Sequence, residues 1–428
     1  MRRLLGRFLR DSEGSIAIIT GALAIPMLFL VGMGIDYGLA VDRQTQLNGY
    51  ADAAVLAAVT PSMMTQTIAA ATTAATNMFN SQAANLPSIA YDPSKLTVSV
   101  QTVNSQRVAS VTYRATYKTV FSSILGMAAM PLAGTSSATA GLPPNIDFYL
   151  LLDDSPSMAI AATQSGINTM VAATPTQGGC AFACHESHPS SDNLGNPQGE
   201  DNYALARNLK VALRMDLVQQ AAQNLMGTAA TTEKSNGAAY RMGIYTFDTA
   251  VNTIQTLTSN LTTAQTAAAN ISVLPVYANN LLTSSNNNSD TDTNYDNAMN
   301  SLNTTMPNPG SGTTVKGDTP QEVLFFVTDG VEDELVGNAR QQSVMDPAWC
   351  TKIKNRGIRI ALLYTSYLPL PTNSWYNKYI APIQANIAPT LQTCASAGMF
   401  FQVDIGGDIS AALTQLFQYS VQSAYLSM

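Results

Sequence analysis

Charged residues are scarce in this chain of 428 residues. Asp, Glu, Lys and Arg together make up 11% of it, less than half of the share of about 25% that is usual in soluble domains. Ser, Thr, Asn, Gln and Ala must therefore cover most of the surface, which is typical of an exported protein. The net charge is −7 and the isoelectric point is about 4.8, so no basic stripe is available to neutralise phosphate groups. This composition excludes a nucleic-acid-binding protein.

An uncharged apolar run near the N-terminus has the length of a membrane span. It extends from Gly14 to Ile35, and as a helix it would be roughly 33 Å long, enough to cross the hydrocarbon core of a bilayer. Asp36 follows the run, and the only concentrated basic cluster of the chain precedes it: Arg2, Arg3, Arg7 and Arg10. By the positive-inside rule, residues 1–13 are cytoplasmic, residues 14–38 are the transmembrane anchor, and the rest of the chain lies in the opposite compartment.

A cleaved signal peptide is the alternative to an anchor. The apolar region of a signal peptide usually has about 7–15 residues, which is shorter than this run. Gly38-Leu39-Ala40 nevertheless has the form of a cleavage site. The length of the run favours an uncleaved anchor.

The region from 39 to 140 predicts helices followed by a β-hairpin. Apolar residues recur at helical spacing from Leu39 to Ala58, so the membrane helix should continue beyond the bilayer, and the Ala/Thr-rich residues 61–90 should form a second helix. Residues 96–103 and 108–117 alternate in polarity around a turn-like Asn-Ser-Gln segment, which indicates a hairpin. A helix followed by a small sheet is similar to the architecture of pilins, although the sheet could equally be a spacer.

Short motifs around the apolar run resemble those of a known family. Arg10-Asp11 and Glu13-Gly14 precede the run, Asp36-Tyr37-Gly38 follows it, and Gln46-Leu47 and Ala51-Asp52-Ala53-Ala54 come later. This opening of about fifty residues resembles the N-terminal segment of TadE/TadG-like Flp (tight-adherence) pilus-assembly proteins. Processed pilins carry Glu five residues after a Gly, whereas here Glu precedes Gly, so prepilin-type processing is not indicated.

Two apolar, strand-like runs in the rest of the chain each end on an aspartate. The first ends at Asp153, which is followed by Ser155 and Ser157, and the second ends at Asp329, which is followed by Gly330. Such runs are typical of strands buried on both faces of a parallel sheet, and ligands bind beyond the carboxyl ends of those strands. A carboxylate and two hydroxyls on one tight loop are hard oxygen ligands, suited to Mg²⁺ or Mn²⁺.

Strand patterns alternate with helical patterns from about residue 145 to residue 428. The alternation predicts an α/β domain with a doubly wound parallel sheet, with an insertion at about 159–202 and a Gly-Leu-Pro-Pro linker before it. Helices are expected at 203–226 and 408–425. The candidate strands are residues 146–152, 241–247, 250–257, 323–327, 358–364 and 399–403.

A polar loop at 290–298 completes a three-part pattern. The Asp-x-Ser-x-Ser element, this loop and the Thr-Asp-Gly element resemble the metal-ion-dependent adhesion site of von Willebrand factor type A domains. The resemblance assigns the loop threonine to Thr293, which is followed by Asn as in the family, with Thr291 as the alternative. The family often has Gly where this chain has Pro156, which implies a stiffer loop but no lost ligand. The resemblance implies that Mg²⁺ or Mn²⁺ is held by five residues: Asp153, Ser155, Ser157, Thr293 and Asp329.

Two other interpretations apply to the loop after Asp153. Serine and aspartate after a strand often cap the next helix. A phosphatase could use Asp153 as its nucleophile, but phosphoaspartyl enzymes carry a second Asp two residues on, where this chain has Ser155. The order of the three elements, each at a strand–loop junction, favours the metal site.

The four cysteines all follow the apolar run. An even number in an oxidising compartment predicts disulfides, and we expect Cys180 to pair with Cys184 and Cys350 with Cys394, although three pairings are possible. An alternative is a zinc site built from four neighbouring residues: Cys180, Cys184, His185 and His188. That cluster is tight for a tetrahedral site, and haem attachment requires one residue fewer between the cysteines.

The two resemblances together imply a single-pass protein of the bacterial inner membrane, with its bulk in the periplasm and a role in Flp/Tad pilus assembly. The metal site would bind a protein partner, a pilus-machinery or envelope component that supplies a carboxylate. We expect no enzymatic activity, since no His or Lys lies beside the ligand residues in the sequence. The alternatives are an extracytoplasmic metal-dependent hydrolase and a pilin-like structural subunit, against which the missing processing motif counts.

Overall fold

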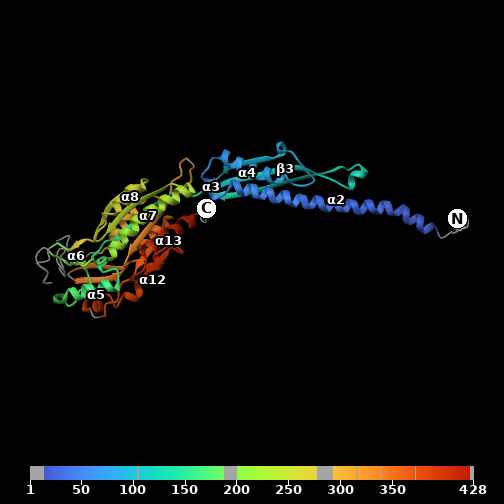
Figure 1. Ribbon diagram of the computed structural model, residues 1–428. Coiled ribbons are helices and arrows are strands. Elements are labelled where there is room, and N and C mark those ends of the chain that lie inside the picture. Colours follow the sequence, from blue (N-terminus) through green and yellow to red (C-terminus); the bar gives the residue numbers. More distant parts are fainter. Residues whose placement is uncertain are drawn as a thin grey trace, which may run out of the picture. The chain divides into compact units, whose positions relative to one another are not determined.

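The computed structural model describes residues 14–103, 106–187, 200–276, 293–314, 316–337, 339–371 and 373–424. The chain divides into two compact units, Met1–Leu142 and Pro143–Met428 (Figure 1). Three groups of residues considered above lie outside the described ranges: the N-terminal arginines, Thr291 and His188.

The first unit is built on one long helix, α2 (Gly14–Ala58), of 45 residues. Its first half leaves large apolar side chains exposed, and the segment Ile18–Ala58 is long and apolar enough to cross a membrane. Its second half buries Leu47, Ala51 and Ala54 in the core of the unit. The helix therefore continues beyond the predicted span, as its apolar spacing indicates.

A short antiparallel sheet and a second helix pack against the later part of α2. The sheet has β3 (Gln106–Lys118) at its centre, paired with β1 (Ile89–Tyr91), β2 (Thr97–Val103) and β4 (Ala129–Gly141). The predicted hairpin, β2 with β3, is confirmed. The predicted single helix over 61–90 is wrong in its extent, because the region forms α3 (Pro61–Met64), α4 (Ile68–Ala83) and β1.

The second unit contains a six-stranded sheet. Its strand order is β14-β13-β10-β5-β7-β8. These strands are β5 (Ile146–Asp153), β7 (Tyr240–Phe247), β8 (Val251–Thr258), β10 (Gln321–Thr328), β13 (Arg359–Thr365) and β14 (Phe400–Val403). Two small ribbons accompany it: β6 (His185–Glu186) with β9 (Pro275–Val276), and β11 (Val331–Val336) with β12 (Ala339–Val344).

The helices described in the second unit alternate with these strands in the sequence, and the last of them follows β14. They are α5 (Gln164–Ala173), α6 (Asn202–Asn208), α7 (Arg214–Asn236), α8 (Leu261–Ala268), α9 (Tyr295–Thr305), α10 (Ala348–Asn355), α11 (Ser374–Tyr379), α12 (Gln384–Cys394) and α13 (Ile409–Ala424).

The prediction of a doubly wound parallel sheet is confirmed only in part, because the sheet is mixed. Five strands are parallel, but β8 runs antiparallel to β7. Only three residues, 248–250, connect these two strands. A connection this short can join antiparallel neighbours only, since a parallel pair needs a crossover of a dozen or more residues.

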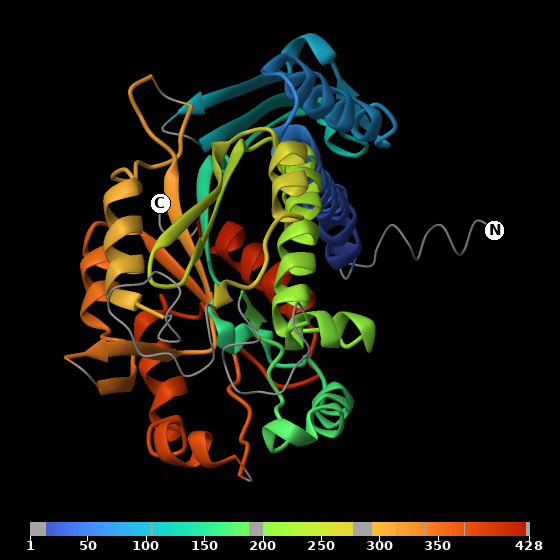
Figure 2. The ribbon, with the colours of Figure 1, turned by 90° about the vertical axis from the view of Figure 1, so that its left-hand side faces the viewer.

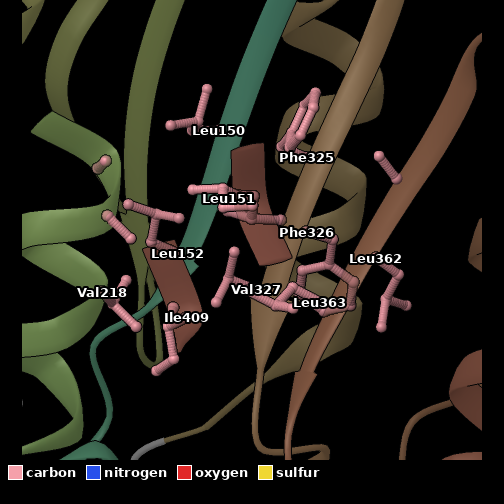
Figure 3. Close-up of a cluster of buried hydrophobic side chains, with 14 of the residues drawn as sticks. Leu150, Leu151, Leu152, Val218, Phe325, Phe326, Val327, Leu362, Leu363 and Ile409 are labelled. Atoms are coloured by element: carbon pink, nitrogen blue, oxygen red, sulfur yellow. The ribbon is translucent and has the colours of Figure 1, made fainter. Parts of the chain in front are cut away.

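Helices cover both faces of this sheet (Figure 2). On one face, Phe148 of β5 packs against Phe417 of α13, and Figure 3 shows Val218 of α7 and Ile409 of α13 on the same side as Leu152. On the other face, Phe326 of β10 meets Tyr295 of α9. Residues of β5 are buried along its whole length, which explains why its sequence is apolar without alternation.

The predicted helix over 203–226 is two helices. Lys210 has φ +56°, a left-handed conformation that ends α6. A new helix begins at Arg214, where the Asp216 carboxylate accepts a hydrogen bond of 2.8 Å from the Leu213 amide. The leucine spacing continues across this break and therefore conceals it.

Candidate metal centre

Neighbouring strands bring the two predicted aspartates to the same edge of the sheet. β5 and β10 are adjacent and parallel, with Leu152 opposite Val327. Each strand is followed by one of the two loops, so Asp153 and Asp329 lie side by side. Thr328 joins them, because its hydroxyl donates to Asp153 Oδ2 at 2.7 Å.

The loop after Asp153 is held by its own hydroxyl groups. Both the backbone N–H and Oγ of Ser155 donate to Asp153 Oδ1, at 3.1 and 2.5 Å. The hydroxyls of Ser155 and Ser157 are 2.9 Å apart. Pro156 opens a 3₁₀ turn here, and its fixed φ suits that turn. The Asp-x-Ser-x-Ser spacing thus places three oxygen-bearing side chains in one cluster.

Gly330 allows the chain to turn directly after Asp329. Its φ of +82° is one that residues with a side chain rarely adopt, and a Cβ here would lie 2.3 Å from Ile387 Cγ2. The turn lets the Val331 amide donate back to Asp329 Oδ1 at 3.3 Å. Glycine is therefore required by both backbone conformation and space.

Thr293 is buried in a loop fastened on two sides. Its N–H and C=O both pair with the backbone of Asp333 in β11, at 3.2 and 3.0 Å, and the next amide, that of Asn294, donates to Asp248 O at 3.0 Å. Thr293 and Ser157 line the same cavity. The structure thus brings Thr293 to the rim where the other four predicted residues lie.

That cavity has a volume of about 250 Å³. Its wall includes Glu186 from the insertion, together with Asp333 and Arg340, which form an ion pair. Arg340 also lies over the ring of Trp375, 5.1 Å from its centroid. The candidate centre therefore opens into a polar hollow with an aromatic wall, large enough to receive a side chain of another molecule.

Burial makes the negative charges of this centre costly. Asp153 and Asp329 are both fully buried. Burial raises the pKa of Asp153, and the neighbouring negative charge of Asp329 raises it further. Burial likewise raises the pKa of Asp329, against the opposing effects of the Arg214 charge and the Ser157 hydroxyl. A nearby cation would lower both.

Arg214 is a cation beside this centre that was not predicted from the sequence. It lies at the start of α7 with its Nη1 atom 4.0 Å from Asp329 Oδ2. Neither of these atoms has a hydrogen-bond partner among the described residues. The only signal in the sequence was an arginine within a leucine-rich helical pattern.

A hard divalent cation fits this group of side chains. The donors are two carboxylates and three hydroxyls, which are oxygen ligands of the kind that Mg²⁺ and Mn²⁺ take. Asp329 Oδ2 is buried without a hydrogen bond among the described residues, and a buried polar atom of this kind calls for a partner. No group of three or more His, Cys, Asp or Glu side chains in the described part of the chain could hold a metal ion, so any such ion here needs hydroxyl ligands.

Two residues that hold Asp153 in place, Thr328 and Tyr295, were also not predicted from the sequence. Thr328 donates to Asp153, and the hydroxyl of Tyr295 lies 2.6 Å from that of Thr328. Tyr295 is fully buried beneath the Thr293 loop at the start of α9. Thr328 was visible in the Thr-Asp-Gly pattern, whereas Tyr295 carried no signal.

One predicted disulfide is confirmed, and the other is absent. Cys350 in α10 is bonded to Cys394 at the end of α12. Cys180 and Cys184, both within the described residues, are not joined to each other. Between them Phe182 forms an isolated antiparallel bridge with Ile160, and the Ala183 amide donates to Ala159 O at 2.9 Å. This segment is therefore paired with residues 159–160 and does not bring the two sulfur atoms within bonding reach.

A family model described as putative Flp pilus-assembly TadE/G-like matches residues 14–76. Residues 14–76 are therefore similar to that family. The resemblance seen in its motifs is confirmed for this segment, which contains the apolar part of α2. That helix, which is long and apolar enough to cross a membrane, together with the family match indicates a membrane-anchored protein.

The other comparisons add little. No curated protein matches the chain. Among solved structures, it is similar to BatB from Bacteroides thetaiotaomicron, with 11% identity, 65% of this chain and 100% of that chain covered, and a TM-score of 0.34. It is also similar to the von Willebrand factor domain of a type V pilus tip protein from Porphyromonas gingivalis, with 9% identity, coverage of 66% and 98%, and a TM-score of 0.37. For the minor pilin PilB of Streptococcus sanguinis the identity is 11%, both coverages are 78% and the TM-score is 0.35. Likenesses this weak do not bear on the function of this chain.

Proposed function

We propose that this chain is a membrane-anchored accessory protein of Flp/Tad pilus assembly whose second unit binds a protein partner through a divalent cation. The TadE/G-like segment supports the pilus role. One observation carries the binding mode: the buried Asp329 Oδ2, without a hydrogen bond among the described residues, lies at the same sheet edge as Asp153 and its hydroxyl cluster.

Five residues would hold the cation, Mg²⁺ or Mn²⁺: Asp153, Ser155, Ser157, Thr293 and Asp329. When bound, it supplies a positive charge to which a carboxylate of the partner can bind. Thr328 and Tyr295 keep Asp153 oriented by hydrogen bonds, the role that supporting groups have around metal ligands. The cavity beside Ser157 and Thr293 provides room for the partner's side chain.

A binding role suits these contacts better than hydrolysis does. The side chains that hydrogen bond to Asp153 are the hydroxyls of Ser155 and Thr328, which serve as ligands or supports rather than as general bases at neutral pH. The chain is therefore proposed to be a non-enzymatic protein, with a metal-dependent hydrolase as the competing function.

We place the protein in the bacterial inner membrane as a single-pass protein with its bulk in the periplasm. The arginines before the apolar run support this orientation, and the buried disulfide between Cys350 and Cys394 suits an oxidising compartment. A periplasm-active reporter fused after Val59 should be active, and the protein should stay in the membrane at high salt. A soluble protein that begins near Val41 would show a cleaved signal peptide instead.

The binding proposal is tested by affinity capture from bacterial membranes, with Mg²⁺ or with a chelator. The wild-type chain should retain a defined partner in Mg²⁺ and release it in the chelator, and Asp153→Ala should retain none. Asp296→Asn is the matched control, because Asp296 is an exposed carboxylate next to the Thr293 loop and not a proposed ligand. Equal capture by wild type and Asp153→Ala would refute the binding mode.

A further inference from the structure

The turn between β3 and β4 exposes a cluster of apolar side chains. We call residues 119–128 the apolar tip; it contains no charged residue. The exposed fraction of its large side chains runs from 42% for Phe121 to 70% for Ile124. Five such side chains are exposed: Val120, Phe121, Ile124, Leu125 and Met127. Contiguous apolar surface of this kind marks a contact with another apolar phase or molecule.

Asp36 fastens the apolar tip to α2. Its carboxylate accepts hydrogen bonds from the backbone N–H groups of Val120, Phe121 and Ser122, at 2.9, 2.9 and 2.6 Å. Asp36 itself is fully buried by this contact. Because Asp36 is the first charged residue after the apolar run, the tip is attached where the proposed membrane span ends.

The tip reaches back along the apolar run. The side chain of Phe121 lies against Gly32, where an added Cβ would be only 2.7 Å from Phe121 Cβ. Gly32 precedes Asp36 by four residues of helix, which is roughly 6 Å along the axis toward the N-terminus. Apolar groups that lie in a membrane interface are buried by about 5–10 Å. In a bilayer spanned by the apolar run, the tip would lie at this interfacial depth.

We propose that the apolar tip enters the lipid bilayer beside α2, on the side of the membrane that carries the rest of the chain. The inference rests on the proposed membrane anchoring and adds a second point of membrane contact. A lone helix can rotate and tilt in a bilayer, and interfacial contacts restrict both motions. The exposed Lys118 at the end of β3 would remain among the headgroups. The first unit would thus be held in one orientation to the membrane.

Tryptophan fluorescence in proteoliposomes tests this contact. The full-length chain has two tryptophans, Trp349 and Trp375, both in the second unit, and the wild type supplies their background. Three variants each add one tryptophan at an exposed apolar position of the first unit: Ile124→Trp in the tip, Leu28→Trp in the run and Leu56→Trp farther along α2. Phospholipids brominated near the headgroup quench tryptophans that enter the bilayer.

We expect the brominated lipids to quench most of the added emission of Ile124→Trp and Leu28→Trp, and to leave the added emission of Leu56→Trp unquenched. Quenching of Leu28→Trp without quenching of Ile124→Trp would overturn the tip contact and leave the anchoring intact, as expected if another protein covers the tip. Absence of quenching for Leu28→Trp would overturn the anchoring and this inference with it.

Discussion

Nη1 of Arg214 lies 4.0 Å from Oδ2 of Asp329, and both side chains are almost completely buried. Neither atom has a hydrogen-bond partner among the described residues. The guanidinium therefore offsets the charge of Asp329 through space only. The proposed cation would neutralise the same carboxylate by direct contact. Arg214 and the metal would therefore both stabilise the negative charge of Asp329.

Replacing Arg214 should make the stability of the second unit depend more strongly on the metal. Arg214→Met leaves a buried carboxylate without its cation, which should cost about 3–5 kcal/mol of unfolding free energy in the absence of metal. Mg²⁺ should recover part of that loss, so its stabilising effect should be larger than in the wild type. Denaturant unfolding followed by tryptophan fluorescence measures both quantities.

Arg207→Met is the matched control, because Arg207 forms an exposed ion pair with Asp216. Exposed pairs contribute about 0–1 kcal/mol. This pair is bidentate and therefore somewhat stronger, but its loss should still cost less than the loss of the buried Arg214. The proposal that Arg214 and the metal both stabilise Asp329 would be contradicted by either of two results. One is an equal loss of unfolding free energy in the two variants, and the other is a stabilisation by Mg²⁺ that is no larger in Arg214→Met than in the wild type.

Removing Asp153 should separate folding from metal binding. Asp153→Ala deletes a proposed ligand and also relieves its repulsion with Asp329, so the variant should fold. Wild type should gain about 2.7 kcal/mol when Mg²⁺ is present at a hundred times its dissociation constant, and Asp153→Ala should gain nothing. Ser155→Ala should keep part of the gain, since a neutral hydroxyl holds a dication less strongly than a carboxylate does. Thermal unfolding with and without millimolar Mg²⁺ or Mn²⁺ measures the gain in each protein. An unchanged wild-type melting temperature would argue against the metal centre.

Removing the disulfide should weaken the second unit. The bond between Cys350 and Cys394 closes a loop with a sequence separation of 44, and the chain-entropy estimate for such a loop is about 4 kcal/mol. The double variant Cys350→Ala/Cys394→Ala should lose an amount of this order and should become insensitive to reductant. Cys180→Ala/Cys184→Ala should respond to reductant as the wild type does. Non-reducing peptide mapping that finds Cys180 joined to Cys184 would contradict the structure.

Glu322 should make the stability of the second unit depend on pH. It lies opposite Asp147 in the sheet, and both of its carboxyl oxygens are buried without a hydrogen bond among the described residues. Burial, with the negative charge of Asp147, raises the pKa of Glu322 to about 8, from about 4.3 in an unfolded chain. Its contribution to stability is therefore complete below about pH 4 and is lost as the pH rises through about 8.

Glu322 alone should account for a loss of at most about 1.4 kcal/mol per pH unit within that window. Glu322→Gln keeps the shape of the side chain without the charge, so it should be the more stable protein above pH 8 and should show a flatter profile. Denaturant unfolding at a series of pH values provides the comparison. Glu200→Gln, at an exposed position, should retain the wild-type profile, and a parallel decline in Glu322→Gln would assign the effect to other groups.

Asp36 should control the mobility of the apolar tip independently of lipid. Asp36→Ala leaves three backbone N–H groups without their charged acceptor, which should lower the free energy of local opening by about 2–4 kcal/mol. Hydrogen exchange in detergent should then be faster at residues 120–122. Asp42→Ala is the control, because Asp42 bonds to its helix neighbours Arg43 and Gln46. Equal exchange in the wild type and Asp36→Ala would show that the carboxylate does not hold the tip.

Features of the fold that depend only on residues close together in the sequence were predicted from local patterns. The uncharged run up to Asp36, the hairpin of β2 and β3 and the aspartate at each strand end all follow from short stretches of sequence. The Cys350–Cys394 pair also agreed with the structure. The prediction of one helix over 203–226 is wrong at Lys210. The leucines repeat at the same spacing on both sides of this residue, and composition does not reveal its left-handed backbone conformation.

Contacts between distant parts of the chain were decided by the tertiary structure. Asp36 and the apolar tip are about eighty-five positions apart, and Arg214 meets Asp329 from another element altogether. No local pattern distinguishes a buried arginine from an exposed one, because the partner determines which is stable. The residue types in the sequence were enough to predict the proposed oxygen ligands and their place at strand ends. Only the packing of β10 against β5, with one antiparallel strand at the sheet's edge, placed those ligands at a single rim, since strand order depends on which buried faces fit together.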